Sequence, residues 1–267
     1  MSYFFLKCRE VALAAAHDAG DLIRENWRKP QTINYKGAID LVTAIDRQSE
    51  QRIVERLRRE FPDHSILAEE ETAISGTGRY RWIVDPLDGT TNFAHGYPQF
   101  CISIALESEG KIQLGVIYDP LRDELFSALD GRGAKLNEEP ITTSKTPELN
   151  SSLLGTGFPY DRREHADFYL TFFKAFMTRC QGIRRTGSAA LDLCYVACGR
   201  LDGFWELKLK PWDIAAGALI VAEAGGRLSN FKGENFSIWG SETLASNGRI
   251  HGEMTHIAGA ITNKFVD

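Results

Sequence analysis

The densest group of chemically capable side chains lies in one nine-residue string, Asp85-Pro86-Leu87-Asp88-Gly89-Thr90-Thr91-Asn92-Phe93. The apolar run RWIV leads into two carboxylates three positions apart, with a proline that restricts the turn and a glycine that relieves crowding. Backbone amides and hydroxyls at a following helix start can bind an anion. Oxygen-only ligands favour Mg²⁺, Mn²⁺ or Ca²⁺ over zinc. The string therefore predicts a site for a metal-bound phosphate, although an Asp-Gly pair by itself is usually only a turn.

Two further acidic segments are candidates for the same site. Glu69-Glu70-Glu71 follows a short apolar run; three consecutive glutamates are usually a solvated loop, but their place at a strand end strengthens a functional interpretation. Asp213 follows Trp212 at a predicted helix start, where a lone aspartate is most often a cap.

Taken together, these strings resemble those of the inositol monophosphatase family of Mg²⁺-dependent, lithium-sensitive phosphatases. The resemblance covers roughly residues 5–260, with matches in the family's order at 40–46, 69–70, 85–93, 187–190, 212–217 and 223–226. One departure is Ala68, which stands where the family usually has glycine, serine or threonine.

The resemblance implies a role for each matched position. The implied metal ligands are Glu69, Asp85, the Leu87 carbonyl, Asp88 and Asp213. The implied catalytic residues are Thr90, Asp46 and Glu69, of which Thr90 and Asp46 would orient or activate the attacking water. The implied substrate-binding residues are Asp88, Gly89, Thr90, Thr91, Gly187, Ser188, Ala189 and Glu206. Lys36 would lie on a mobile loop that can complete an additional metal site.

Electrostatics supports a cation-filled site. The acidic candidates come from five separate segments, and packing them together would bring strong repulsion and raised pKa values. Two or three Mg²⁺ ions would remove that repulsion and neutralise a bound phosphate. We therefore expect a Mg²⁺-dependent phosphomonoesterase that hydrolyses myo-inositol monophosphates by direct in-line attack of a metal-activated water.

Two alternative functions stay open at this point. Related enzymes act on fructose 1,6-bisphosphate, histidinol phosphate or 3′-phosphoadenosine 5′-phosphate, and the Glu206 carboxylate only weakly favours a polyol over a second phosphate. Some bacterial members of the family act through contacts with the transcription machinery. Arg184-Arg185, just before the predicted substrate-binding residues, is the candidate surface for such a contact or for a dimer interface.

Composition and charge disfavour two other classes of function, nucleic-acid binding and membrane insertion. The 267 residues are 43% hydrophobic and 25% charged, close to globular averages. A net charge of −5 does not favour direct nucleic-acid binding, and no stretch approaches the roughly 20 apolar residues of a membrane span. Five cysteines without a CxxC pair indicate reduced thiols, so we expect a cytoplasmic protein that does not bind a membrane.

The elements that must position these motifs are of mixed α/β (α+β) type. In the first half we expect helices over 5–27 and 43–61, a loop over 31–42, and strands over 65–68, 80–84, 101–107, 111–118 and 123–128 that form an antiparallel meander. In the second half we expect helices over 164–179, 188–199, 211–223 and 250–262, with strands over 152–156, 201–206, 227–230 and 243–246.

The resemblance implies how these elements assemble. It implies a layered αβαβα sandwich of the sugar-phosphatase type, in which the meander sheet is followed by a second, smaller mixed sheet. We place the seam between an N-terminal half, residues 1–140, with the metal-binding motif, and a C-terminal half, residues 141–267, with the substrate loop and the last metal ligand. The two halves would form one compact unit. Members of the family are commonly dimeric, so the resemblance also implies a homodimer.

Overall fold

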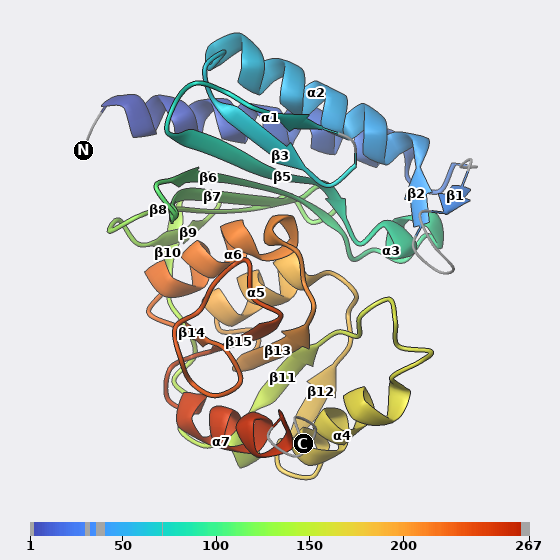
Figure 1. The fold of residues 1–267 in the computed structure, drawn as a ribbon, viewed down its shortest axis with the longest axis vertical. Helices are drawn as coiled ribbons and strands as arrows, with labels where there is room; N and C mark the ends of the chain where they lie inside the picture. The colour runs from blue at the N-terminus through green and yellow to red at the C-terminus, as the bar shows by residue number, and fades with distance from the viewer. Residues whose placement is uncertain (1–2, 30–32, 36–40, 71, 263–267) are drawn as a thin grey trace.

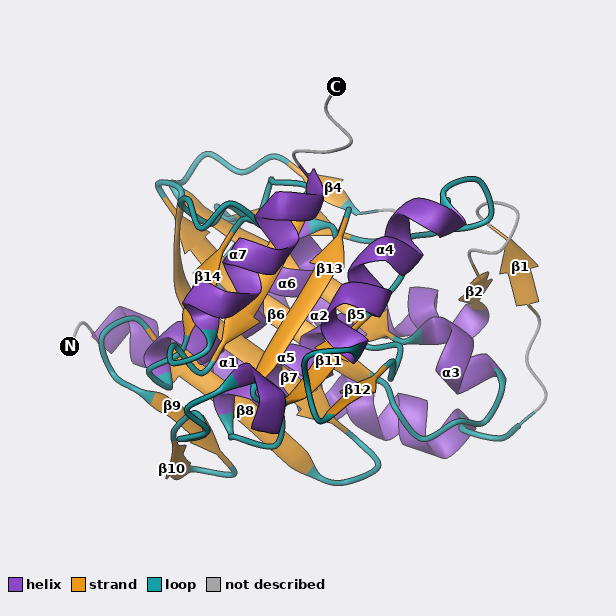
Figure 2. Cartoon of the chain, turned by 90° about the horizontal axis from the view of Figure 1, so that it is seen from below, coloured by secondary structure: helices purple, strands orange, loops and turns teal. Residues whose placement is uncertain are grey.

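Helices and sheets alternate in five layers in the computed structural model, which describes residues 3–29, 33–35, 41–70 and 72–262 (Figure 1). The first outer layer holds α1 (Tyr3–Asn26) and α2 (Ala44–Glu60), and the central layer holds α5 (Ala189–Ala197) and α6 (Pro211–Glu223). The second outer layer holds α4 (Ala166–Met177) and α7 (His251–Thr262), which lie across the smaller sheet (Figure 2). The predicted αβαβα sandwich is confirmed. None of the described helices is long and apolar enough to cross a membrane.

The larger sheet has eight strands in the order β10-β9-β8-β7-β6-β5-β3-β4. Neighbours from β5 to β10 pair antiparallel, as the predicted meander requires, whereas β3 joins β5 in parallel. The short strands β4, β9 and β10 were not predicted, because two or three residues carry no readable alternation. The strands are β3 (Ser65–Ala68), β4 (Ala73–Ile74), β5 (Tyr80–Asp88), β6 (Cys101–Ser108), β7 (Lys111–Asp119), β8 (Glu124–Leu129), β9 (Ala134–Leu136) and β10 (Glu139–Ile141).

The smaller sheet has five strands in the order β12-β11-β13-β15-β14 and is mixed, as expected. Strand β11 pairs in parallel with β12 and β13, and the other pairs are antiparallel. The strands are β11 (Leu153–Thr156), β12 (Gly182–Arg184), β13 (Gly203–Leu207), β14 (Arg227–Ser229) and β15 (Glu242–Ser246). A one-turn helix η1 (Leu149–Ser151) precedes β11.

One expected loop is wrong in part. Residues 31–42 include β1 (Ile33–Tyr35) and the first two residues of β2 (Leu41–Thr43), and the two strands pair antiparallel. Three-residue strands leave too short a pattern to predict from the sequence. Lys36, the candidate for a mobile loop, lies outside the described residues, so its role stays a prediction.

The central layer sets the position of the site, because α6 lies directly against the larger sheet. A β-carbon at Gly115 of β7 would come within 2.6 Å of the Ala216 carbonyl oxygen in α6, so glycine permits backbone contact between them. Nine of the thirteen α6 residues are buried, and Gly217 of α6 leaves room for the Leu193 side chain of α5. This tight packing fixes the start of α6, and with it Asp213, beside the ends of β5 and β6.

Candidate active site

The end of β5 is irregular where the acidic string begins. Asp85 pairs with Ser103 and Asp88 with Cys101, so β5 uses four positions where β6 uses three. Pro86 explains the bulge, because it has no N–H to donate to the ladder. The Ser49 hydroxyl of α2 donates to the Pro86 carbonyl over 2.8 Å, and the Leu87 amide donates to the Asp85 carboxylate over 2.9 Å. The bulge therefore re-aims the two carboxylates of β5.

Glycine continues this turn into the short helix α3 (Thr90–Ala94). Gly89 has a φ of +96°, and a β-carbon there would lie 2.8 Å from the Gln99 carbonyl oxygen. Both the backbone conformation and the crowding therefore require glycine. The arrangement sets Thr90 and Thr91 immediately beyond Asp88.

Neighbouring elements bring the other two acidic residues to the same place. Glu69 follows β3, and its amide donates to the Val84 carbonyl of the adjacent parallel strand, which sets it beside Asp85. Asp213 lies in the first turn of α6, and the Ser103 hydroxyl of β6 donates to the preceding Trp212 carbonyl over 3.1 Å. Two sheet strands and one helix start thus converge at one edge of the large sheet.

One cavity of about 440 Å³ opens over this edge. Its lining contains nearly all the residues that the sequence predicted for the site: Glu69, Asp85, Leu87, Asp88, Gly89, Thr90, Thr91, Gly187, Ser188, Ala189, Glu206 and Asp213. Asp46 is buried behind this lining and reaches it through Thr90.

Burial and mutual repulsion disfavour the ionised forms of the acidic residues. Burial, then the charges of Glu69, Asp88 and Asp213, raise the pKa of Asp85 well above its usual range. Burial also raises the pKa of Asp88 to about 6, although the hydrogen bonds from Ser188 and Ala190 oppose this shift. Burial, and then the charges of Glu69 and Asp88, raise the pKa of Asp213 well above its usual range. A divalent cation at this point would remove both costs.

The free oxygens fit such a cation. Asp85, Asp88 and Asp213 each accept backbone or hydroxyl hydrogen bonds on one oxygen, and the other oxygen has no hydrogen bond to a described residue. Among the described side chains, however, no three acidic, histidine or cysteine groups already converge closely enough to define a metal site by themselves. The donor set is oxygen only, which suits Mg²⁺ in chemistry.

Thr90 and Asp46 form a buried pair beside the carboxylates. The Thr90 hydroxyl lies 2.7 Å from Asp46 Oδ1 and 3.0 Å from the Leu87 carbonyl oxygen, and it donates to these acceptors. Asp46 Oδ2 accepts from the Thr43 amide and hydroxyl at the start of α2, and burial raises the pKa of Asp46. Because the Thr90 hydroxyl hydrogen is directed at Asp46 and the Leu87 carbonyl, the lone pairs of the Thr90 oxygen are free to accept a hydrogen bond from water.

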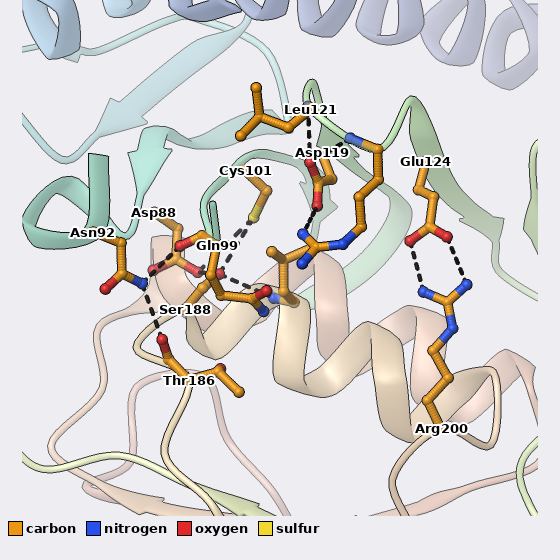
Figure 3. Close-up of polar contacts among 12 residues, drawn as sticks. Asp88, Asn92, Gln99, Cys101, Asp119, Leu121, Glu124, Thr186, Ser188 and Arg200 are labelled. Carbon is orange, nitrogen blue, oxygen red and sulfur yellow. Dashed lines mark hydrogen bonds and ion pairs between the residues drawn. The ribbon is translucent and has the colours of Figure 1, made fainter. Parts of the chain in front are cut away.

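The substrate loop, defined here as residues 186–189, closes the opposite wall. Asp88 Oδ2 accepts from the Ser188 hydroxyl over 2.7 Å and from the Ala190 amide over 2.8 Å (Figure 3). Asp88 thus joins the end of β5 to the start of α5. Glu206 of β13 lies against Gly157, and burial raises its pKa well above the usual range while the Arg185 charge opposes the shift.

Several residues of this cavity were not singled out from the sequence. Asp192, fully buried, accepts from the Thr186 hydroxyl over 2.7 Å. Both Arg184 and Arg185, which the sequence offered only as a contact surface, are exposed, but Arg185 lines the cavity and Arg184 donates to the Ile183 carbonyl. The two arginines therefore have different surroundings, which the dipeptide alone does not reveal. Others that line the cavity are Phe158, Pro159, Tyr160, Asp161, Arg162, Lys208 and Lys210; the Gly-Phe-Pro turn at 157–159 is a loop signal that could have pointed to them.

Comparison with known proteins defines the class. The sequence model of the inositol monophosphatase family matches residues 7–263. An inositol-1-monophosphatase of Synechocystis sp. is 47% identical over 258 residues, which are 96% of this chain and 90% of that protein. The Nus factor SuhB of Escherichia coli is 43% identical over 244 residues, 90% of this chain and 91% of that one. The crystal structure of extragenic suppressor protein SuhB from Bartonella henselae is 41% identical, covers 94% of this chain and 98% of its own, and superposes with a TM-score of 0.91.

The fold and the family match are therefore those of a phosphatase, in a family that is generally metal-dependent. The chain belongs to the inositol monophosphatase family. The recognition made from the sequence motifs is confirmed.

Proposed function

We propose that this chain is a Mg²⁺-dependent phosphomonoesterase that hydrolyses myo-inositol monophosphates. The observation that carries the proposal is the cavity itself, which has anionic oxygens from β3, β5 and α6 on one side and the substrate loop with Glu206 on the other. The similarity to an inositol-1-monophosphatase at 47% identity supports the substrate class.

Mg²⁺ would be held by Glu69, Asp85, the Leu87 carbonyl, Asp88 and Asp213, with two or three ions in the site. When bound, the ions would neutralise the phosphate, lower the pKa of water and stabilise the leaving alkoxide. A lithium-sensitive enzyme is the corresponding expectation.

The chain's own residues would then arrange the reaction. Gly89, Thr90 and Thr91 would hold the phosphate, and Asp88, Gly187, Ser188, Ala189 and Glu206 would bind the cyclitol. Thr90, with its proton committed to Asp46, would accept a hydrogen bond from the attacking water and orient it in line with the leaving oxygen. The water attacks phosphorus, the P–O bond to the cyclitol breaks, and the alcohol and phosphate leave.

A substrate panel tests this proposal. Phosphate release would be measured from myo-inositol 1-phosphate, fructose 1,6-bisphosphate, histidinol phosphate and 3′-phosphoadenosine 5′-phosphate, each with Mg²⁺ or with EDTA. We expect Mg²⁺-dependent release that is fastest from the inositol ester. Faster release from another ester of the panel would make that ester the proposed substrate in place of the inositol ester. No release from any ester would contradict the proposed activity.

A second function is favoured by one comparison. The Escherichia coli relative is called a Nus factor, and exposed Arg184 lies at the end of the edge strand β12. We infer that this surface contacts a protein of the transcription machinery. Retention of RNA polymerase or its elongation factors by wild type and not by Arg184→Ala would support the contact, while equal retention would remove Arg184 from it.

We also propose a homodimer in the cytoplasm. Helix α4 exposes Leu170 and Met177, with half-buried Phe173 between them, along one apolar stripe near β12. All five cysteines are free, in accord with a reducing compartment. Light scattering should report a mass of about twice 29.8 kDa, and Leu170→Glu/Met177→Glu should shift it toward a single chain; a single-chain mass for wild type would exclude the dimer.

A further inference from the structure

The side chain of Asn92 binds the backbone of two separate segments, one at Gln99 and the other at residues 186–187. Its amide nitrogen donates to the carbonyl oxygens of Gln99 and Thr186 over 2.7 and 3.0 Å (Figure 3). It also donates to the Gly187 carbonyl oxygen over 3.3 Å. An amide nitrogen has two hydrogens, so the three acceptors share them. Asn92 therefore links α3, which carries the proposed phosphate-binding threonines, to the substrate loop, which lies more than ninety residues further along the chain.

The contact depends on a close approach of the Asn92 side chain to the Gly187 backbone. Gly187 has a φ of +89°, and a β-carbon there would lie 3.0 Å from Asn92 Nδ2 and 2.8 Å from an Arg185 nitrogen. No larger residue could bring its carbonyl to Asn92 without displacing one side. The geometry at Gly187 is thus matched to the Asn92 amide.

The substrate loop is held on its other sides as well. The Thr186 hydroxyl donates to buried Asp192, and the Ser188 hydroxyl donates to Asp88, both over 2.7 Å. Residues 186, 187 and 188 thus each have a fixed partner, and those of Gly187 and Ser188 come from the first half of the chain. Asp192 also binds the loop backbone, through its amide on the Ser188 carbonyl, whereas Asn92 binds it through a side chain, at the two consecutive carbonyls of residues 186 and 187.

We propose that Asn92 is a positioning residue that holds the substrate loop at a fixed distance from the phosphate-binding residues 89–91. This inference rests on the proposed function, in which one wall binds the phosphate and the other binds the cyclitol. Because Asn92 follows Thr91 directly, any shift of the loop relative to α3 changes that distance. Asn92 would therefore govern selection of the leaving group, and its contribution to phosphate binding itself would be small.

Asn92→Ala tests the positioning role through a ratio of two substrates. Myo-inositol 1-phosphate uses both walls of the cavity, while p-nitrophenyl phosphate has a planar leaving group without hydroxyls for Glu206 or the substrate loop. A displaced wall should lower kcat/KM for the inositol ester about 10- to 100-fold, and that for the aryl ester by less than about 3-fold. Asn230→Ala is the matched control, because Asn230 makes several loop hydrogen bonds far from the cavity, and it should leave the ratio unchanged.

Hydrogen–deuterium exchange of residues 184–191, in Mg²⁺ buffer, tests the same proposal without turnover. Exchange there should be faster in Asn92→Ala than in wild type or Asn230→Ala. If Asn92→Ala does not change the exchange rate of residues 184–191, Asn92 does not hold the loop, whatever the activity. If kcat/KM falls equally for both esters, Asn92 has no role in leaving-group selection. If wild type hydrolyses neither ester, the proposed function fails, and so does selection of a leaving group, while the exchange result still decides whether Asn92 holds the loop.

Discussion

The proposed orientation of the attacking water depends on where the hydroxyl hydrogen of Thr90 points. Its hydroxyl donates to Asp46, so its oxygen can accept from water. Valine has nearly the same shape but no oxygen, so Thr90→Val should lower kcat by about 10²- to 10⁴-fold with little change in KM. Thr90→Ser keeps the hydroxyl and should retain most of the rate. Steady-state kinetics on myo-inositol 1-phosphate measures both, and a Thr90→Val enzyme of normal kcat would remove Thr90 from water orientation.

Asp85 has an electrostatic cost that a neutral side chain would relieve. Asparagine retains an oxygen that can accept from the Leu87 amide, but it removes a charge opposed by burial and by three acidic neighbours. In EDTA at pH 7, Asp85→Asn should therefore raise the free energy of unfolding by about 1–3 kcal/mol. Urea denaturation measures this change, and a destabilised variant would show that Asp85 is not under repulsion.

At this scale nearly all the residues that the sequence motifs singled out line one cavity, and the structure adds the physical reasons why they lie together. The pattern of Asp85 and Asp88 was readable because proline and glycine mark the turn between a strand and a helix. Asn92 and Asp192 were not singled out, because their partners are distant in sequence and a lone Asn or buried Asp has no pattern of its own. The assigned roles of the matched residues stay predictions.

At the scale of elements, the contact between β7 and α6 positions Asp213. Gly115→Ala would press a methyl group against the α6 backbone, which cannot rotate away, and should destabilise the protein by about 2–3 kcal/mol. Gly252→Ala in α7 is the matched control, since open space surrounds it and alanine should stabilise the helix by about 0.5–1 kcal/mol. Thermal unfolding compares them, and equal effects would contradict the packing argument.

His251 holds the start of α7 against the smaller sheet. Its ring nitrogens lie 2.9 Å from the Ser246 and Ser229 hydroxyls. Ser229 donates onward to the Asn230 carbonyl, so it accepts from His251 Nε2–H, and Nδ1 accepts from Ser246. This arrangement requires a neutral ring, and burial, with the charge of Arg227, lowers the pKa of His251 to about 4.

Acid should therefore weaken this element. Because the folded pKa is below the unfolded value of 6.5, the stability that His251 contributes is present above pH 6.5 and is lost as the pH falls toward 4. The loss should reach about 3 kcal/mol at most. The free energy of unfolding of wild type and His251→Gln, measured between pH 7 and pH 4, tests this loss. Parallel pH profiles for the two proteins would refute the assignment of the acid effect to His251.

The long elements were predictable, and most of the short ones were not; among the three-residue strands only β14 (Arg227–Ser229) was predicted. Helices such as α2 and strands such as β6 and β7 have enough residues for a period to emerge, and their ends agree within a few positions. The hairpin of β1 and β2 and the edge strand β12 have three residues each, and their pairing partners decide their conformation.

At the scale of the whole molecule, the cavity exists only where the two halves of the sequence meet. The seam at residues 140–141 stays a prediction, and β10 (Glu139–Ile141) crosses it while pairing with β9. Asp88, Asn92 and Ser103 of the first half bond directly to the segments that carry Ser188, Gly187 and Asp213 in the second. The order of layers could be inferred from the family resemblance, but this contact set required the structure.

The central claim is that these carboxylates form a Mg²⁺ site, and a Mg²⁺ titration of thermal stability tests it most directly. Wild type should gain about 2.7 kcal/mol at a hundredfold excess of Mg²⁺ over its dissociation constant. Asp85→Asn, more stable than wild type in EDTA, should gain much less. Equal stabilisation of both proteins by Mg²⁺, or none of wild type, would contradict the account.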